Sequence, residues 1–399
     1  MKRQYFPELQ GIRAVAVLAV ITVHTAFTSG YMGFMDYRPD NEVFAVLLER
    51  FTRESLPILF ALSGFLIYRP FALATIAGTE KPDLRAYAWR RVLRLFPAYW
   101  LVAIVMLVLL NRENITGFWY LLRVVTMQHV YNEGGIPTGM ESTWSMGTEV
   151  AFYALLPLFA WAAGRWAGRT GHAVARARRI LAGAGGVILV GYAFTAYSHQ
   201  ESLGMYPIQG NWPPGWFGYL AVGMALAAMS AAAEVAPNAL IGPYRLVARH
   251  PGATWFTALV VILLFCFSPA GGQGTSDYPS LGTALFDQPI DLAIVFLILA
   301  PLTVPGVRSR FIQNVLTIRP LQYIGRVSYG MFLWHIPVIY IWNGSMIGAD
   351  NFLKAMVIVM GGSFAAAVIS YYAVERPAMR LRNRLGRAGR EPSVAVLVR

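Results

Sequence analysis

The chain has 399 residues, of which 56% are hydrophobic and only 13% are charged, and its mean hydropathy is +0.49. Soluble proteins carry about 25% charged residues, so this composition excludes an ordinary soluble protein and predicts an all-α polytopic membrane protein. The single cysteine, Cys266, excludes an intrachain disulfide and a multi-cysteine metal site. We expect no cleavable signal peptide, because the first apolar run lacks a small-residue cleavage pattern after a short core.

Ten apolar stretches are long enough to form transmembrane helices. The second contains Pro57 and Gly64, the third Pro97 and the ninth Pro337. Membrane helices tolerate such residues where neighbours or cavities satisfy the freed backbone groups. The predicted spans are about 11–29, 54–72, 95–111, 148–164, 180–197, 215–233, 253–269, 289–305, 324–342 and 353–374.

The basic residues predict the orientation of these spans. With the N-terminus in the cytoplasm, 26 of the 33 lysine and arginine residues fall in inner segments and adjoining span ends. We therefore predict that both termini are cytoplasmic. The net charge of +13 then reflects topology in a lipid bilayer, and nucleic acid is not expected as a partner. We predict one transmembrane domain over 1–379 and a basic, mobile tail over 380–399 near the anionic inner leaflet.

The first predicted span contains two ionisable residues, Arg13 and His24. Eleven helical residues at ~100° each return to within about 20° of the start, so both side chains share one face, roughly 16 Å apart along the axis. Ionisable groups inside a membrane are costly and usually face a cavity or a partner. The face would then offer a fixed cation near one surface and a titratable base deep inside. In the alternative interpretation, Arg13 snorkels to the headgroups and His24 is a hydrogen-bonded interior residue.

A cluster of arginines, Arg90, Arg91 and Arg94, precedes the third span on the predicted inner side. Spacings of three and four place them on one helix face. Such a cluster suits bidentate contacts to phosphates, as on the nucleotide end of coenzyme A. Binding of inner-leaflet headgroups explains the cluster equally well.

The predicted outer side has two long segments, 31–53 and 112–143, with polar and aromatic residues. They could form a site for a hydroxyl acceptor, or be ordinary solvated loops with an interfacial aromatic belt. Glu149 opens the fourth span shortly after Trp144. A carboxylate there is favoured by the helix dipole, and it could instead orient His24 or bind an acceptor hydroxyl.

Two further ionisable residues receive structural interpretations. His335 lies beside Pro337, which favours a hydrogen bond at a helix break. Glu375 ends the last span at the inner surface, where pairing with an arginine is the simplest explanation. The six histidines show no metal-ligand spacing, so we predict no metal site.

Several motifs, in order along the chain, resemble the acyltransferase-3 family of integral membrane O-acyltransferases. The resemblance covers nearly the whole chain, with features of an actinobacterial member. The motifs are FPELQGIRAVAVLAVITVH, LSGFLIYRPF, RRVLRLFPAYW, WSMGTEVAFY, GRVSYGMFLWHIP and the terminal ERP.

The resemblance implies transfer of a small acyl group, often acetyl, from cytoplasmic acyl-CoA to a hydroxyl on an extracytoplasmic or membrane-associated acceptor. Such acceptors include polysaccharides, glycolipids, peptidoglycan and macrolides. By position, Arg13 and His24 match the family's functional pair, and Glu149 matches its carboxylate. The basic motif matches Arg90, Arg91 and Arg94. The chain departs from many members at Pro57, where they carry an aspartate.

The sequence therefore predicts a multi-pass acyltransferase of the bacterial cytoplasmic membrane, with acyl-CoA as co-substrate and no tightly bound cofactor. In this hypothesis the arginines hold the CoA phosphates and His24 removes the proton of the acceptor hydroxyl. A covalent intermediate on Ser63 is an alternative to direct transfer. The rival function is a transporter or flippase of a glycolipid or other envelope precursor, with Arg13, His24 and Glu149 along a polar path.

Overall fold

The computed structural model describes residues 6–32, 42–132, 134–204, 206–238, 240–267, 279–307, 309–349 and 351–384. This part of the chain consists of α-helices joined by loops and short helical turns, and it contains no strand. Each of the ten predicted spans overlaps one long helix over most of its length. These helices are α1 (Glu8–Thr28), α3 (Ser55–Ala77), α4 (Leu84–Leu109), α6 (Trp144–Ala167), α7 (Ala173–Ser198), α8 (Pro213–Val235), α10 (Pro251–Cys266), α11 (Leu281–Thr303), α13 (Arg319–Asn343) and α14 (Phe352–Ser370).

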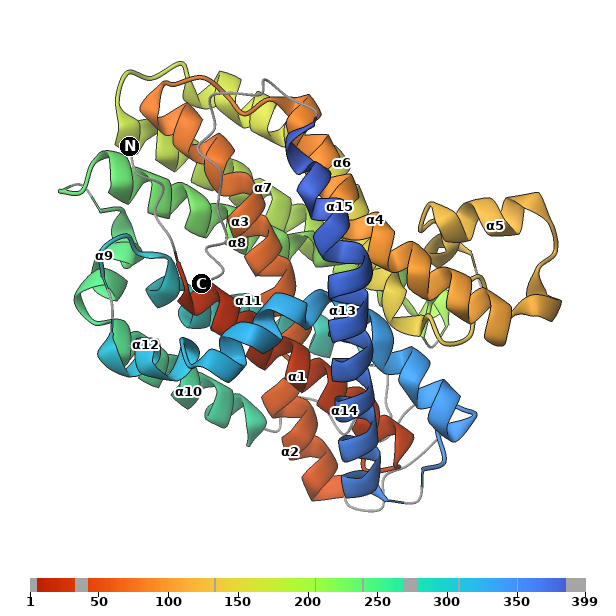
Figure 1. Ribbon diagram of the computed structural model, residues 1–399. Coiled ribbons are helices and arrows are strands. Elements are labelled where there is room, and N and C mark those ends of the chain that lie inside the picture. Colours follow the sequence, from red (N-terminus) through yellow and green to blue (C-terminus); the bar gives the residue numbers. More distant parts are fainter. Residues whose placement is uncertain are drawn as a thin grey trace.

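Shorter helices connect or extend the long ones. They are α2 (Glu42–Thr52), α5 (Phe118–Val125), α9 (Gly242–Arg249), α12 (Arg310–Leu316), a π-helix (Tyr371–Glu375) and α15 (Arg376–Arg380). Helix α5 projects away from the rest of the bundle (Figure 1). The predicted tail begins at the end of α15, and its residues 385–399 lie outside the described residues.

Eight helical segments of the described chain are long and apolar enough to cross a membrane, and the pair α9–α10 makes a ninth. That pair is bent by 106° at His250 and Pro251, just before the predicted span 253–269, and α9 was not predicted. The remaining predicted span, α13, is 25 residues long but more polar, since it carries Arg319, Gln322 and Arg326. The all-α polytopic fold is confirmed. The cytoplasmic location of the termini stays a prediction.

The described part of the bundle contains two large hydrophobic cores and a small third cluster, and α1 takes part in all of them. One core is built mainly by α3 and α8, and α1 adds Leu9 and Ile12 to it. The other is built mainly by α4 and α13, and α1 adds Val17 and Val20. In Figure 1, α1 accordingly runs through the middle of the bundle, between α3 and the pair α13–α14. A polar side chain on the buried faces of α1 therefore lies in the interior of the protein.

Candidate functional site

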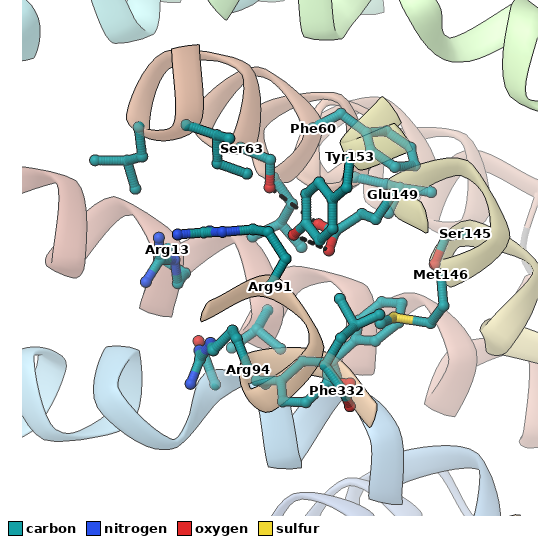
Figure 2. Close-up of a pocket in the computed structure, with 18 residues that line it drawn as sticks. Arg13, Phe60, Ser63, Arg91, Arg94, Ser145, Met146, Glu149, Tyr153 and Phe332 are labelled. Atoms are coloured by element: carbon teal, nitrogen blue, oxygen red, sulfur yellow. Dashed lines mark hydrogen bonds between the residues drawn. The ribbon is translucent and has the colours of Figure 1, made fainter. Parts of the chain in front are cut away.

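A cavity of about 140 Å³ lies between α1, α3, α4, α6 and α13, and we call it the arginine cavity. Figure 2 shows Arg13, Arg91 and Arg94 gathered at one end of it, and Ser145 and Phe332 at the other. Three guanidinium groups from two helices thus meet in one small space. Such an arrangement provides a binding site for an anion, because guanidinium groups form bidentate hydrogen bonds with phosphate oxygens.

Close backbone packing fixes the position of Arg13. A β-carbon at Gly11 would stand 2.0 Å from the carbonyl oxygen of Leu316. A β-carbon at Gly325 of α13 would likewise stand 2.1 Å from the carbonyl oxygen of Gln10. The glycines at these positions let α1 lie directly against α12 and α13. The side chain of Arg13 is thereby directed into the arginine cavity.

Aromatic rings and one carboxylate hold the other two arginines. Arg94 donates to Glu375 at 3.2 Å and lies 5.2 Å from the centre of the Tyr329 ring. Arg91 lies 5.8 Å from the centre of the Tyr153 ring. Pairing of Glu375 with an arginine was predicted, and it is confirmed. Arg90, which the sequence grouped with Arg91 and Arg94, does not line the cavity.

Glu149 lies in the middle of the arginine cavity (Figure 2). One carboxylate oxygen accepts a hydrogen bond from Ser63 Oγ at 2.9 Å, and the other accepts one from Tyr153 Oη at 2.8 Å. The hydrogen bonds of Glu149 thus go to these two hydroxyls rather than to His24. The interpretation that Glu149 orients the imidazole is corrected accordingly: Glu149 orders the wall of the arginine cavity.

A second cavity of about 380 Å³ contains His24, and we call it the histidine cavity. Its size falls within the range of about 300–1,000 Å³ that is usual for small-molecule sites. Arg13 and His24 therefore open into different cavities along one helix. Leu56, Ser145 and Phe332 line both cavities, so the two cavities meet at these residues.

Aromatic and charged side chains line the histidine cavity. Trp144 and Trp216 lie with their ring centres 4.8 Å apart, and Glu49, Arg53 and Asp291 also face the cavity. Carboxylates accept hydrogen bonds from hydroxyl groups, and aromatic faces offer apolar contact area. The cavity is thus suited to a hydroxyl-bearing molecule. Its tryptophans come from α6 and α8, and α1 and α13 each add a phenylalanine.

Sequence reasoning missed an ion-pair cluster in the wall of the histidine cavity. Arg53 donates to Asp287 and to Asp291 of α11, at 3.0 Å in each case. Asp291 inside the predicted span 289–305, with Asp287 just before that span, was a usable signal, since charges within a membrane helix are costly. Pro57 also lines this cavity, so carboxylates reach it from Glu49 and Asp291 rather than from residue 57.

A second histidine contacts His24 from α13. His335 Nε2 lies 3.3 Å from His24 Nδ1, and the ring centres are 4.9 Å apart. His335 Nδ1 lies 2.6 Å from the carbonyl oxygen of Phe332, in its own helix. A hydrogen bond to the backbone near Pro337 is therefore present, but α13 continues through Pro337, so the predicted helix break is absent. The contact with His24 was not predicted.

Residues 6–375 match the family model described as an acyltransferase domain. The chain belongs to this acyltransferase family, the acyltransferase-3 family. It is 25% identical over 401 residues to YrhL of Bacillus subtilis (strain 168), which is named as a candidate peptidoglycan O-acetyltransferase. It is 23% identical over 392 residues to the peptidoglycan O-acetyltransferase OatA of Listeria monocytogenes.

Both alignments cover 94% of the chain but only 55% and 56% of the two relatives. The chain thus spans about half the length of the curated relatives that it matches. No solved structure matches it. Its apolar helices and its family together establish a multi-pass cell-membrane protein of an acyltransferase family.

Proposed function

We propose that this protein is a membrane O-acyltransferase that moves a small acyl group, acetyl in the simplest case, from acyl-CoA to a hydroxyl. The acceptor is an extracytoplasmic or membrane-associated glycolipid, polysaccharide or macrolide. One observation carries the proposal: a cavity with three arginines meets a cavity with a histidine at Leu56, Ser145 and Phe332. An anionic donor and a hydroxyl acceptor could approach each other at this junction from opposite sides.

The arginine cavity supplies the donor side. Arg13, Arg91 and Arg94 bring positive charge to the end of the bundle that the positive-inside rule assigns to the cytoplasm. Phosphate groups of CoA are the matching anions. The pantetheine arm would then run past Glu149 and Ser63 toward the junction. Because Arg13 lies with the other arginines, its role is binding of the donor rather than stabilisation of the oxyanion.

The histidine cavity supplies the acceptor side. The acceptor hydroxyl oxygen attacks the thioester carbonyl carbon while His24 takes the hydroxyl proton. The carbon–sulfur bond then breaks, the acyl group stays on the acceptor oxygen, and the CoA thiolate leaves. The protonated imidazole returns its proton to the thiolate. No metal is needed for this sequence of steps.

The hydrogen bond between Ser63 and Glu149 supports an alternative route through a covalent acyl-enzyme on Ser63. In that route Glu149 would accept the Ser63 proton while Ser63 Oγ takes the acyl group. However, Ser63 lines the arginine cavity and not the histidine cavity, so the acyl group would then lie apart from His24. We therefore favour direct transfer.

Two cavities in series would also suit a transporter, which is the second candidate function. The test uses protein in nanodiscs with labelled acetyl-CoA and a crude extract of envelope lipids and polysaccharides. We expect labelled acceptor and released CoA thiol from the wild type, and neither from the His24→Ala and Arg13→Ala variants. A His250→Ala variant, changed outside both cavities, is the matched control.

Each outcome has a distinct meaning. Full activity of the His24→Ala protein would overturn the general-base role. Label on the protein that disappears in a Ser63→Ala variant would establish the covalent route. Absence of thiol release, together with movement of a labelled glycolipid across proteoliposomes, would replace the transferase by the transporter.

A further inference from the structure

We propose that His335 is a positioning residue that holds the His24 imidazole with Nδ1 protonated, which leaves Nε2 as the basic atom. The inference rests on the proposed function, because it gives a role to a partner of the proposed base. Nothing in the sequence pattern or in the comparisons assigns this role. It follows from three contacts among two imidazole rings and two backbone carbonyls.

The first step concerns the protonation of His335. Its Nδ1 lies 2.6 Å from the carbonyl oxygen of Phe332. A carbonyl oxygen only accepts hydrogen bonds, so Nδ1 must carry the proton. The side chain is 0% exposed, and burial without an anionic partner opposes a charged ring. A neutral ring protonated at Nδ1 has its lone pair at Nε2.

The second step concerns His24. Its Nδ1 lies 2.9 Å from the carbonyl oxygen of Val20, so this nitrogen also carries a proton. The same Nδ1 lies 3.3 Å from His335 Nε2, which carries a lone pair by the first step. The Nδ1–H group of His24 is therefore shared between the Val20 carbonyl and His335. One N–H group can be shared in this way between two acceptors, as in the three-centre hydrogen bonds at helix termini.

The consequence is a free lone pair on Nε2 of His24. His24 lines the histidine cavity, whereas His335 lines neither cavity. His335 thus acts through His24 and does not touch the substrates. When Nε2 takes the acceptor proton, the positive charge spreads to an Nδ1–H group that already has two acceptors in place. Preorganised acceptors of this kind stabilise developing charge without a rearrangement.

A pair of variants separates the positioning role from a packing role. His335→Gln keeps an amide oxygen that can accept the hydrogen bond from His24, whereas His335→Leu has no acceptor. We expect the leucine variant to lower kcat about 100-fold with unchanged KM for acetyl-CoA and for the acceptor. The Val20 carbonyl would remain as one acceptor, but the ring would lose the second acceptor that orients it, and loss of a group that orients a catalytic histidine typically reduces kcat strongly. The glutamine variant should stay within about threefold of the wild type.

An equal loss of kcat in both variants would overturn this inference. So would wild-type kcat in both variants while the His24→Ala protein is inactive. Either result would leave the proposed function intact. Full activity of His24→Ala would overturn both. A measurement on the wild-type protein, which needs no turnover, tests the inference even if the His335 variants fail to fold. In wild-type protein labelled with 15N-histidine, the His24 signals, assigned with His24→Ala, should show a protonated Nδ1 and an unprotonated Nε2. The opposite tautomer would refute the inference directly.

Discussion

Gly64 of α3 lies so close to Leu220 of α8 that a β-carbon at residue 64 would stand 2.1 Å from the Leu220 carbonyl oxygen. Because that atom belongs to the backbone, a larger residue forces the helices apart. These two helices also build much of one hydrophobic core. We expect a Gly64→Ala variant to lose about 3 kcal/mol of stability, in line with overpacked cores. A clear fall in melting temperature in detergent would show it.

A glycine on a neighbouring helix provides the control. A β-carbon at Gly185 of α7 would meet no atom within 4 Å. The Gly185→Ala variant should therefore keep or raise its melting temperature, since alanine favours a helix by about 1 kcal/mol over glycine. Equal melting of the two variants would mean that α3 and α8 do not pack in this way.

Adjacent arginines test the donor side of the proposed site. Arg91 lines the arginine cavity, whereas Arg90 does not. We expect Arg91→Ala to raise KM for acetyl-CoA about tenfold or more, because hydrogen bonds to charged groups contribute about 1.5–3 kcal/mol. The Arg90→Ala variant removes the same charge one residue away and should leave KM unchanged. A similar rise in both variants would indicate general attraction of an anion to a basic surface.

The sequence allowed the fold class and the ten helices to be predicted, because a helix must present about 20 apolar residues to cross a bilayer. Arg13 and His24 could be placed on one face of α1 from their spacing alone, since helical periodicity is local. The bend before Pro251 could not be foreseen, because membrane helices with proline bend or stay straight according to their neighbours.

Partners that lie far apart in the sequence could not be predicted. His335 meets His24 only because α13 packs against α1, and this contact joins residues 311 positions apart. Orientation of His24 was one of the roles left open for Glu149, yet Glu149 bonds to Ser63 and Tyr153. Which of several polar groups a carboxylate meets depends on the rotation of each helix in the bundle. A single sequence does not contain that information.

Phe332 lies where the two cavities meet, and its side chain is 8% exposed. If the acyl group crosses this junction, the ring limits the length of the acyl chain. We expect Phe332→Ala to raise the ratio of kcat/KM for butyryl-CoA to that for acetyl-CoA about tenfold or more. A pocket that accommodates or excludes one methylene changes selectivity by about 1–3 kcal/mol.

The control for Phe332→Ala is Phe152→Ala. Phe152 is 5% exposed, belongs to a hydrophobic core and lines neither cavity. Both variants should lose stability, since removal of a buried phenylalanine costs about 3–5 kcal/mol. Only Phe332→Ala should change the preference for chain length. An unchanged ratio in active Phe332→Ala protein would show that the acyl group does not pass this ring.

His129 predicts how stability depends on pH. Its side chain is 1% exposed, and its Nε2 lies 2.8 Å from the Thr143 hydroxyl. That hydroxyl donates its own proton to the carbonyl of Met140, so His129 must be the donor in this contact. Burial lowers the pKa of His129 from its usual 6.5 to about 4. The histidine is thus neutral in the folded protein at neutral pH.

The sign of the effect follows from proton uptake. Between pH 6.5 and 4 the unfolded chain binds a proton at His129 that the folded protein does not bind, so stability falls as the pH falls. The free energy of unfolding that is lost through this residue is on the order of 3 kcal/mol, and the loss is complete below about pH 4. A His129→Gln variant keeps a donor for Thr143 but lacks the titration. Its melting temperature should therefore fall less than that of the wild type between pH 7.5 and 4.5. Parallel curves would show that His129 is accessible to protons in the folded protein, because the other five histidines are common to both proteins and contribute equally.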